Sequence, residues 1–198
     1  AKHIADGIIA AEIAAAADVV SVGTIYFLGK RIKAADIPKL GMTAAALFVA
    51  SLIHFPIAGT SIHLGLFGIA GIILGINAFP AVFSALLFQA LIFQHGGILS
   101  VGLNSLNMGA GALSAWMIWR MKAVPEPIRA FTAGAIAILI PALLMVIEFQ
   151  FSGYGRRVIF IFYIYALVAV IEGALTLVVV HFFRLVKSPI LEASDEKH

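Results

Sequence analysis

Histidine is the side chain in this sequence best suited to chemistry, and four of the six histidines stand where they could act together. His3 lies near the start of the chain as given, and His54, His63 and His95 lie close to boundaries between apolar and polar sequence. Imidazole is a common ligand for transition metals, and it changes charge near neutral pH. The sequence contains no cysteine, which excludes thiolate metal sites and cysteine nucleophiles. Metal or proton chemistry at histidine is therefore the first hypothesis.

His3 has a further property, which is its distance from Ala1. We expect a free amine at Ala1, because an initiator methionine is normally removed before alanine. That amine, two backbone amides and the His3 ring nitrogen could close three fused chelate rings around one ion. Four nitrogens in a plane suit Ni(II) or Cu(II) far better than Zn(II), Mg(II) or Ca(II). Many chains carry histidine at position 3 by chance, so the position alone does not establish a site.

The composition predicts that these histidines sit in an integral membrane protein. Apolar residues make up 62% of the chain and charged residues 12%, with a mean hydropathy of +1.07, which leaves too little polar surface for a water-soluble globule. At about 20 residues per span, 198 residues leave room for about six to eight transmembrane helices. We expect one transmembrane domain over residues 1–187 and a polar, mobile tail over residues 188–198.

Apolar stretches bounded by glycine, proline and charge predict seven transmembrane helices. They cover residues 7–29, 41–56, 64–79, 81–94, 106–121, 129–151 and 158–186. Asn77 and Pro80 favour a tight turn between the third and fourth. Glu12 and Asp18 lie in the first span, so their face is expected to meet protein or water. The glycine- and asparagine-rich segment 95–111 is expected to form a partly re-entrant loop.

Basic residues predict the orientation, with the N-terminus outside and the C-terminus inside. The basic residues on the inside are then Lys30, Arg31, Lys33, Lys39, Arg120, Lys122, Arg129, Arg184, Lys187 and Lys197. Only Lys2, Arg156 and Arg157 fall outside, as the positive-inside rule requires. This topology brings four histidines to the outer end and leaves His181 near the inner end. A single interfacial histidine is usually structural, but four at one depth favour metal or proton chemistry.

Four segments of the sequence together resemble one known family. The stretches "HIADGII", "FPIAGTSIHLGLFG", "QALIFQHGGILSVGLNSLNMG" and "IEGALTLVVV" are similar, in order and separation, to the CbiM/NikM family. Its members are the substrate-capturing (S) membrane subunits of energy-coupling-factor (ECF) transporters for cobalt and nickel. The resemblance runs from residue 3 to about residue 180. It implies an all-α membrane fold, in which a six-helix core carries an added N-terminal helix whose extreme end tucks into the bundle.

The resemblance also implies a metal site at the N-terminus. In the family, the terminal amine, the amide and ring of the first histidine, and a second histidine from a later loop hold the ion. These histidines correspond to His3 and His63, and Ala1 and Lys2 supply backbone nitrogens. Family members commonly have histidine at position 2, so the ligands cannot be copied unchanged. Either the Lys2 amide joins the plane and His63 moves to an axial or outer position, or the terminus arches and His63 still binds.

Other residues of these segments could support the site. The hydroxyls of Thr60 and Ser61 could fix the His63 ring, or could cap the following helix. Asp6 could orient the His3 imidazole or cap the first span.

Three residues of the glycine-rich loop are expected to brace the inserted N-terminus rather than bind metal: His95, Asn104 and Asn107. Glu172 lies in the last span and must have a partner or water there. The resemblance includes Glu172, but the sequence assigns it no role.

The chain is not expected to hydrolyse ATP, because it lacks a phosphate-binding loop. The nearest look-alike, from Gly23 to Lys30, is one residue too long and lies in an apolar span. The resemblance implies a transmembrane coupling (T) subunit and two ATPase subunits, and leaves open a small accessory membrane subunit. It implies the cell membrane as the location and Ni(II) or Co(II) as the transported ligand. We expect no permanently bound cofactor and no nucleic-acid partner.

Two other functions are alternatives to metal capture. An intramembrane hydrolase using Ser61 is disfavoured, because the sequence has neither a Gly-x-Ser-x-Gly nor a His-Glu-x-x-His arrangement. A self-sufficient metal permease or channel remains the alternative, because polar residues of the first span could line a path.

The orientation can be tested with single cysteines, since the chain has none of its own. Cysteines placed at Ser61 and at Ala34 should react with an impermeant reagent from opposite sides of the membrane, Ser61 from outside. Labelling of both from one side would show that the predicted number of spans is wrong.

Overall fold

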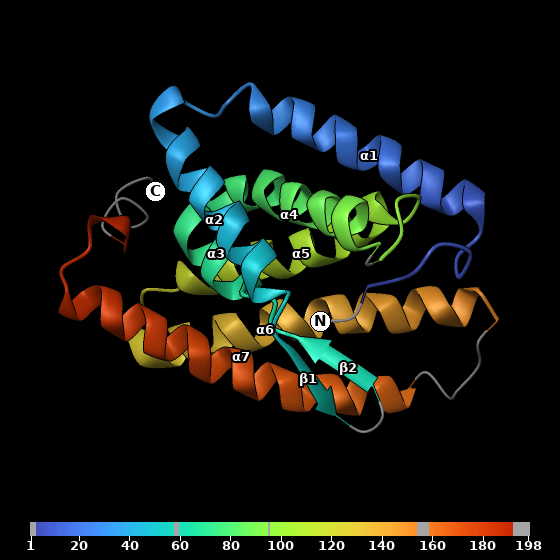
Figure 1. The fold of residues 1–198 in the computed structure, drawn as a ribbon. Helices are drawn as coiled ribbons and strands as arrows, with labels where there is room; N and C mark the ends of the chain where they lie inside the picture. The colour runs from blue at the N-terminus through green and yellow to red at the C-terminus, as the bar shows by residue number, and fades with distance from the viewer. Residues whose placement is uncertain (1–2, 58–59, 95, 154–158, 192–198) are drawn as a thin grey trace.

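A computed structural model describes residues 3–57, 60–94, 96–153 and 159–191 of the chain (Figure 1). These residues form seven α-helices, two short 3-10 helices and one antiparallel hairpin. The elements are α1 (Ala11–Gly29), η1 (Ala34–Asp36), α2 (Ile37–Ala50), β1 (His54–Ile57), β2 (Thr60–His63), α3 (Phe67–Leu74), η2 (Gly75–Asn77), α4 (Ala78–Phe93), α5 (Val101–Trp119), α6 (Glu126–Phe151) and α7 (Ile159–Leu185).

Helix α5 is the centre of the bundle, with α1, α3, α4 and α6 packed around it. Its first turns carry the buried residues Asn104, Ser105 and Asn107, which would be costly to expose to lipid. Enclosure by the neighbouring helices lets these polar residues face protein. Helices α6 and α7 lie side by side (Figure 1), and α1 lies on the opposite side of α5.

Glycines allow the helices to approach closely. A Cβ added at Gly68 of α3 would lie 2.6 Å from the Cα of Gly134 in α6, and one at Gly173 of α7 would lie 2.8 Å from the carbonyl oxygen of Phe131. Small residues at such crossings are typical of helix packing in membranes, where dispersion contacts replace the hydrophobic effect.

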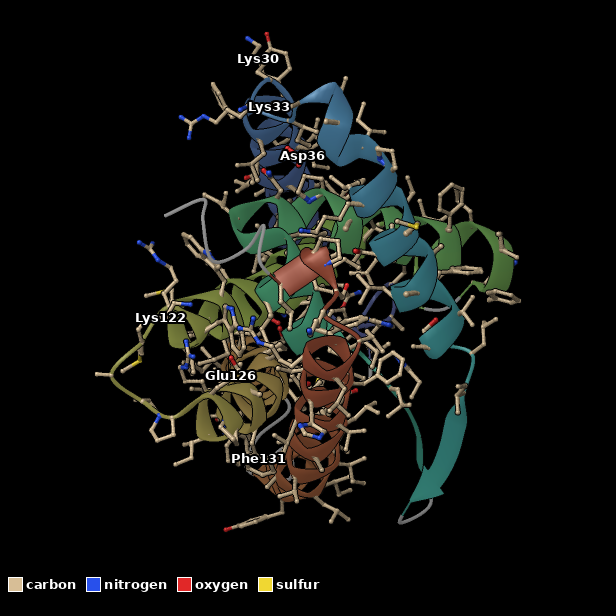
Figure 2. The ribbon with its side chains drawn as sticks, turned by 90° about the vertical axis from the view of Figure 1, so that its left-hand side faces the viewer. Lys30, Lys33, Asp36, Lys122, Glu126 and Phe131 are labelled. Carbon is tan, nitrogen blue, oxygen red and sulfur yellow. The ribbon has the colours of Figure 1, made fainter. Side chains whose placement is uncertain are left out.

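Four stretches of the described chain are long and apolar enough to cross a membrane. They are Ala11–Gly29, Phe67–Phe93, Glu126–Phe151 and Phe162–Leu185. The chain is therefore a helical, multi-pass membrane protein, as its composition predicts. The number of seven spans and the orientation remain predictions. Lys30, Lys33 and Lys122, which the charge pattern assigns to the inside, lie toward one end of the molecule, which Figure 2 views end-on.

Several predicted boundaries are wrong. The predicted second span covers residues 41–56, but α2 ends at Ala50. The segments His54–Ile57 and Thr60–His63 are the paired strands β1 and β2, with His54 opposite His63. The segment 95–111 is helical from Val101 onward rather than a re-entrant loop. A break between the third and fourth helices is present at Gly75, whose φ of +60° suits glycine.

Residues 188–191 differ from the mobile tail that the sequence predicts. Leu191 is buried in the core, and Lys39 Nζ donates a hydrogen bond to the carbonyl oxygen of Ile190 at 3.4 Å. Residues 192–198 lie outside the described part of the chain.

The close crossing of α3 and α6 gives a stability test. Gly68→Ala should lower the free energy of unfolding by about 1–3 kcal/mol, because the new methyl group meets backbone. Gly23→Ala should raise it by about 0.5–1 kcal/mol, since a Cβ there meets nothing within 4 Å and alanine favours helix. Denaturant titration in detergent measures both, and equal effects would contradict this packing.

Candidate metal site

From the start of α1, the N-terminal segment back to His3 runs toward the middle of the helices (Figure 1). Ile4 is 1% exposed and His3 is 7% exposed. The backbone N–H of Ile4 donates to Asn104 Oδ1 at 2.8 Å, and Asn104 Nδ2 donates to the Ile4 carbonyl at 2.9 Å. The Asn104 amide thus pairs with both backbone groups of Ile4, as a neighbouring strand would, and holds His3 inside the bundle.

The loop before α5 packs directly against this segment. Asn104 Nδ2 also lies 3.3 Å from the Gly96 carbonyl oxygen. A Cβ at Gly96 would lie 2.7 Å from the His3 Cβ, and Gly96 has a φ of +90°. Glycine is therefore required here for both its conformation and its size, and it brings the loop against His3.

His63 reaches the same place at the end of β2. It is 1% exposed, and its Nδ1 lies 3.0 Å from the carbonyl oxygen of Leu64. A carbonyl oxygen can only accept, so Nδ1 carries the proton and the lone pair of the ring is on Nε2. This tautomer leaves Nε2 able to bind a metal, with the other ring nitrogen held by a backbone carbonyl.

The two rings, which are sixty residues apart in sequence, lie close together. The ring centroids of His3 and His63 are 4.9 Å apart, and the rings are tilted by 33°. With a metal–nitrogen bond of about 2 Å, ring centres at neighbouring corners of one ion are about 4.5 Å apart and those at opposite corners about 6 Å. The observed separation fits two neighbouring positions on one ion. It fits equally a His63 in the plane with His3 and a His63 in an axial position.

The turn after His63 is held by a carboxylate from α7. Glu172 is 1% exposed, and its Oε1 accepts a hydrogen bond from the Gly65 N–H. The Leu66 N–H lies 3.2 Å from Oε2 of the same carboxylate. Glu172 is thus the partner of the turn that carries the His63 ring, a role that the sequence alone does not assign.

The family model described as CbiM, cobalt uptake substrate-specific transmembrane region, matches residues 3–190. The chain belongs to the CbiM family. The resemblance that the sequence motifs carry is thereby confirmed.

Named relatives agree with this membership, and a solved structure shares the fold. A protein of Haemophilus influenzae named for metal transport is 36% identical over 124 residues, which are 63% of this chain and 60% of that protein. One of Archaeoglobus fulgidus, named as a fused nickel transport protein, is 30% identical over 200 residues, covering 96% of this chain and 68% of that protein. A solved transition metal transporter has a TM-score of 0.82 at 22% identity, covering 97% of each chain, and so shares the fold.

The other predicted site residues of this CbiM-family chain occupy varied places. Asp6 is exposed and lies against Gly97. It does not cap α1, whose N-cap position is Ala10. Thr60 and Ser61 lie in β2, and the N-cap position of α3 is Leu66.

Asn107 contacts a different partner from Asn104. Its Nδ2 donates to Glu148 Oε2 of α6 at 2.9 Å, so its described hydrogen bond joins two helices rather than bracing the N-terminus. His181 is exposed on α7, nine residues after Glu172 and therefore about 13 Å along the helix. Ala1, Lys2 and His95 lie outside the described residues.

Asp18 connects α1 to the helix that holds the N-terminal segment. The Gly102 N–H donates to Asp18 Oδ1 at 2.7 Å, and Ser21 Oγ donates to the Gly102 carbonyl at 2.8 Å. Asp18 therefore faces protein, as its position in an apolar span predicts, whereas Glu12 is exposed. The carboxylate satisfies a backbone N–H at the start of α5, close to Asn104.

The pairing of Asn104 with Ile4 gives a test that needs no metal. Asn104→Ala should speed hydrogen exchange at the Ile4 amide by at least about fivefold, since one lost hydrogen bond to buried backbone costs about 1–3 kcal/mol. Asn107→Ala, one turn further along α5, should leave the Ile4 amide unchanged. Equal exchange rates at Ile4 in both variants would show that Asn104 does not hold the segment.

Proposed function

We propose that this chain is the metal-capturing subunit of a nickel or cobalt importer. The observation that carries the proposal is the buried approach of the His3 and His63 rings, 4.9 Å apart. Two imidazoles at this distance can bind one transition-metal ion. The names of the relatives, which refer to nickel, cobalt or metal transport, favour a transported ion over a structural one.

The proposed ligands combine both rings with backbone nitrogens of the N-terminus. His63 donates through Nε2, because its Nδ1 proton is engaged by Leu64. In a chain that begins at Ala1, the amine and the intervening amides complete a nitrogen-rich set with the His3 ring. Such a set favours Ni(II) over Zn(II), Mg(II) or Ca(II). Competition between Ni(II) and Co(II) for uptake would establish which of the two is preferred.

The importer is proposed to be of the ECF type, driven by ATP hydrolysis on other chains. In this scheme the CbiM-family chain sits in the cell membrane with a transmembrane coupling subunit and two ATPase subunits, and a small accessory membrane subunit remains optional. A self-sufficient permease is the competing function. Uptake that persists in cells lacking only the ATPases would favour the permease, and its loss would favour the ECF importer.

The metal site can be tested by comparing two histidines of the same bundle. His63→Ala should weaken Ni(II) binding by at least about tenfold, the scale expected when a ligand or its close partner is lost. His181→Ala should leave binding unchanged, because His181 lies on the exposed face of α7. Isothermal titration calorimetry on the purified chain measures the Ni(II) affinity of both variants. Equal losses of Ni(II) affinity in the two variants would contradict a specific role of His63 in metal binding.

A further inference from the structure

Glu172 is the most deeply buried carboxylate among the described residues, and the proposed ligand set does not include it. Its side chain is 1% exposed in a helix whose neighbours are largely apolar. A carboxylate in such surroundings is costly unless several donors stabilise it. Here the donors are backbone amides, those of Gly65 and Leu66.

The backbone that Glu172 holds is in an uncommon conformation. Leu66 has a φ of +52° and a ψ of +18°, in the left-handed region that non-glycine residues seldom adopt. Such a conformation persists only where the surroundings enforce it. Gly65 cannot be replaced by a larger residue without meeting the Phe67 ring at 2.6 Å. The conformation of the Gly65–Leu66 turn is therefore enforced by its surroundings. The Glu172 carboxylate accepts the hydrogen bonds of its two amides.

The same turn carries the His63 ring. His63 Nδ1 is bound to the carbonyl of Leu64, which is the residue just before the two amides that Glu172 holds. The direction of the Leu64 carbonyl is fixed by the Leu64–Gly65 peptide plane, whose N–H is the one donated to Glu172. One peptide group thus accepts from the His63 ring and donates to the carboxylate.

Glu172 is itself on a rigid support. Helix α7 crosses α6 so closely that a Cβ at Gly134 would lie 2.6 Å from the Glu172 carbonyl oxygen. At its far end, Arg184 binds Glu126 of α6, with a nitrogen–oxygen distance of 2.8 Å. The carboxylate is therefore set in position by α6 and α7, independently of the hairpin.

We propose that Glu172 is a positioning residue, which fixes the orientation of the His63 ring beside His3 through the Leu64–Gly65 peptide group. It does not contact the metal. The effect on metal affinity rests on the proposed function, whereas the anchoring of the turn does not.

The anchoring is tested on the full chain without metal, by residue-resolved hydrogen exchange in detergent or nanodiscs. Glu172→Ala should speed exchange at the Gly65 and Leu66 amides by tenfold or more. Glu172→Gln, which keeps the shape and one acceptor oxygen, should give a smaller increase. Glu148→Gln is the matched control, because Glu148 accepts from Asn107 on a different pair of helices, and it should leave both amides unchanged.

The route through His63 is tested by a double-mutant cycle on Ni(II) affinity. Glu172→Ala alone should weaken binding by 10–100-fold, the usual range for a residue that orients a ligand. In the His63→Ala background the same substitution should change affinity by less than about twofold, because its effect is already lost. If Glu172→Ala weakened Ni(II) binding in the His63→Ala background as much as in the unaltered chain, the proposal would be overturned.

The remaining outcomes separate the two claims. Unchanged exchange at Gly65 and Leu66 in Glu172→Ala overturns the positioning role, and so does equal acceleration at all core amides, which would mark a loss of the fold. Failure of the unaltered chain to bind Ni(II) or Co(II) overturns the proposed function. The anchoring of the turn by Glu172 is then still decided by the hydrogen-exchange result.

Discussion

Backbone that is not helical must find hydrogen-bond partners inside an apolar bundle, and this requirement shapes the candidate site. Water satisfies such groups at a protein surface, but within a membrane protein the partners must come from the chain itself. Asn104 pairs with both backbone groups of Ile4, and Glu172 accepts from the turn after His63. These two side chains thus supply hydrogen-bond partners to the irregular backbone beside His3 and His63.

The glycines of the bundle allow the close contacts that bring these segments together. Close contact of α3 with α6 at Gly68 and Gly134 brings the start of α3 near α7, and so within reach of Glu172. Gly96 likewise lets the loop before α5 lie against His3. The glycines therefore set the distances, and the polar side chains then fix the irregular backbone at those distances.

The sequence predicts the membrane class, most helices and the identity of the two histidines, and these depend on strong signals. Hydropathy marks the long helices, and the motif resemblance pairs His3 with His63 although sixty residues separate them.

The β1–β2 hairpin is not predicted, because the short, mostly apolar strand β1 continues the apolar pattern of α2. The acidic residues Asp18 and Glu172 were recognised as needing partners, but their partners are backbone amides far along the chain, which no sequence pattern reveals. Asn104 and Asn107 share one motif, yet only the packing of α5 shows that Asn104 bonds to Ile4 and Asn107 to Glu148.

The central claim is that both imidazoles bind one ion, and X-ray absorption at the nickel edge tests it most directly. The full chain loaded with one Ni(II) should show the scattering of two imidazole rings per metal. The His63→Ala chain, loaded at a concentration that saturates it, should show one. A wild-type spectrum without imidazole scattering, or one that is unchanged by the loss of His63, would contradict the account.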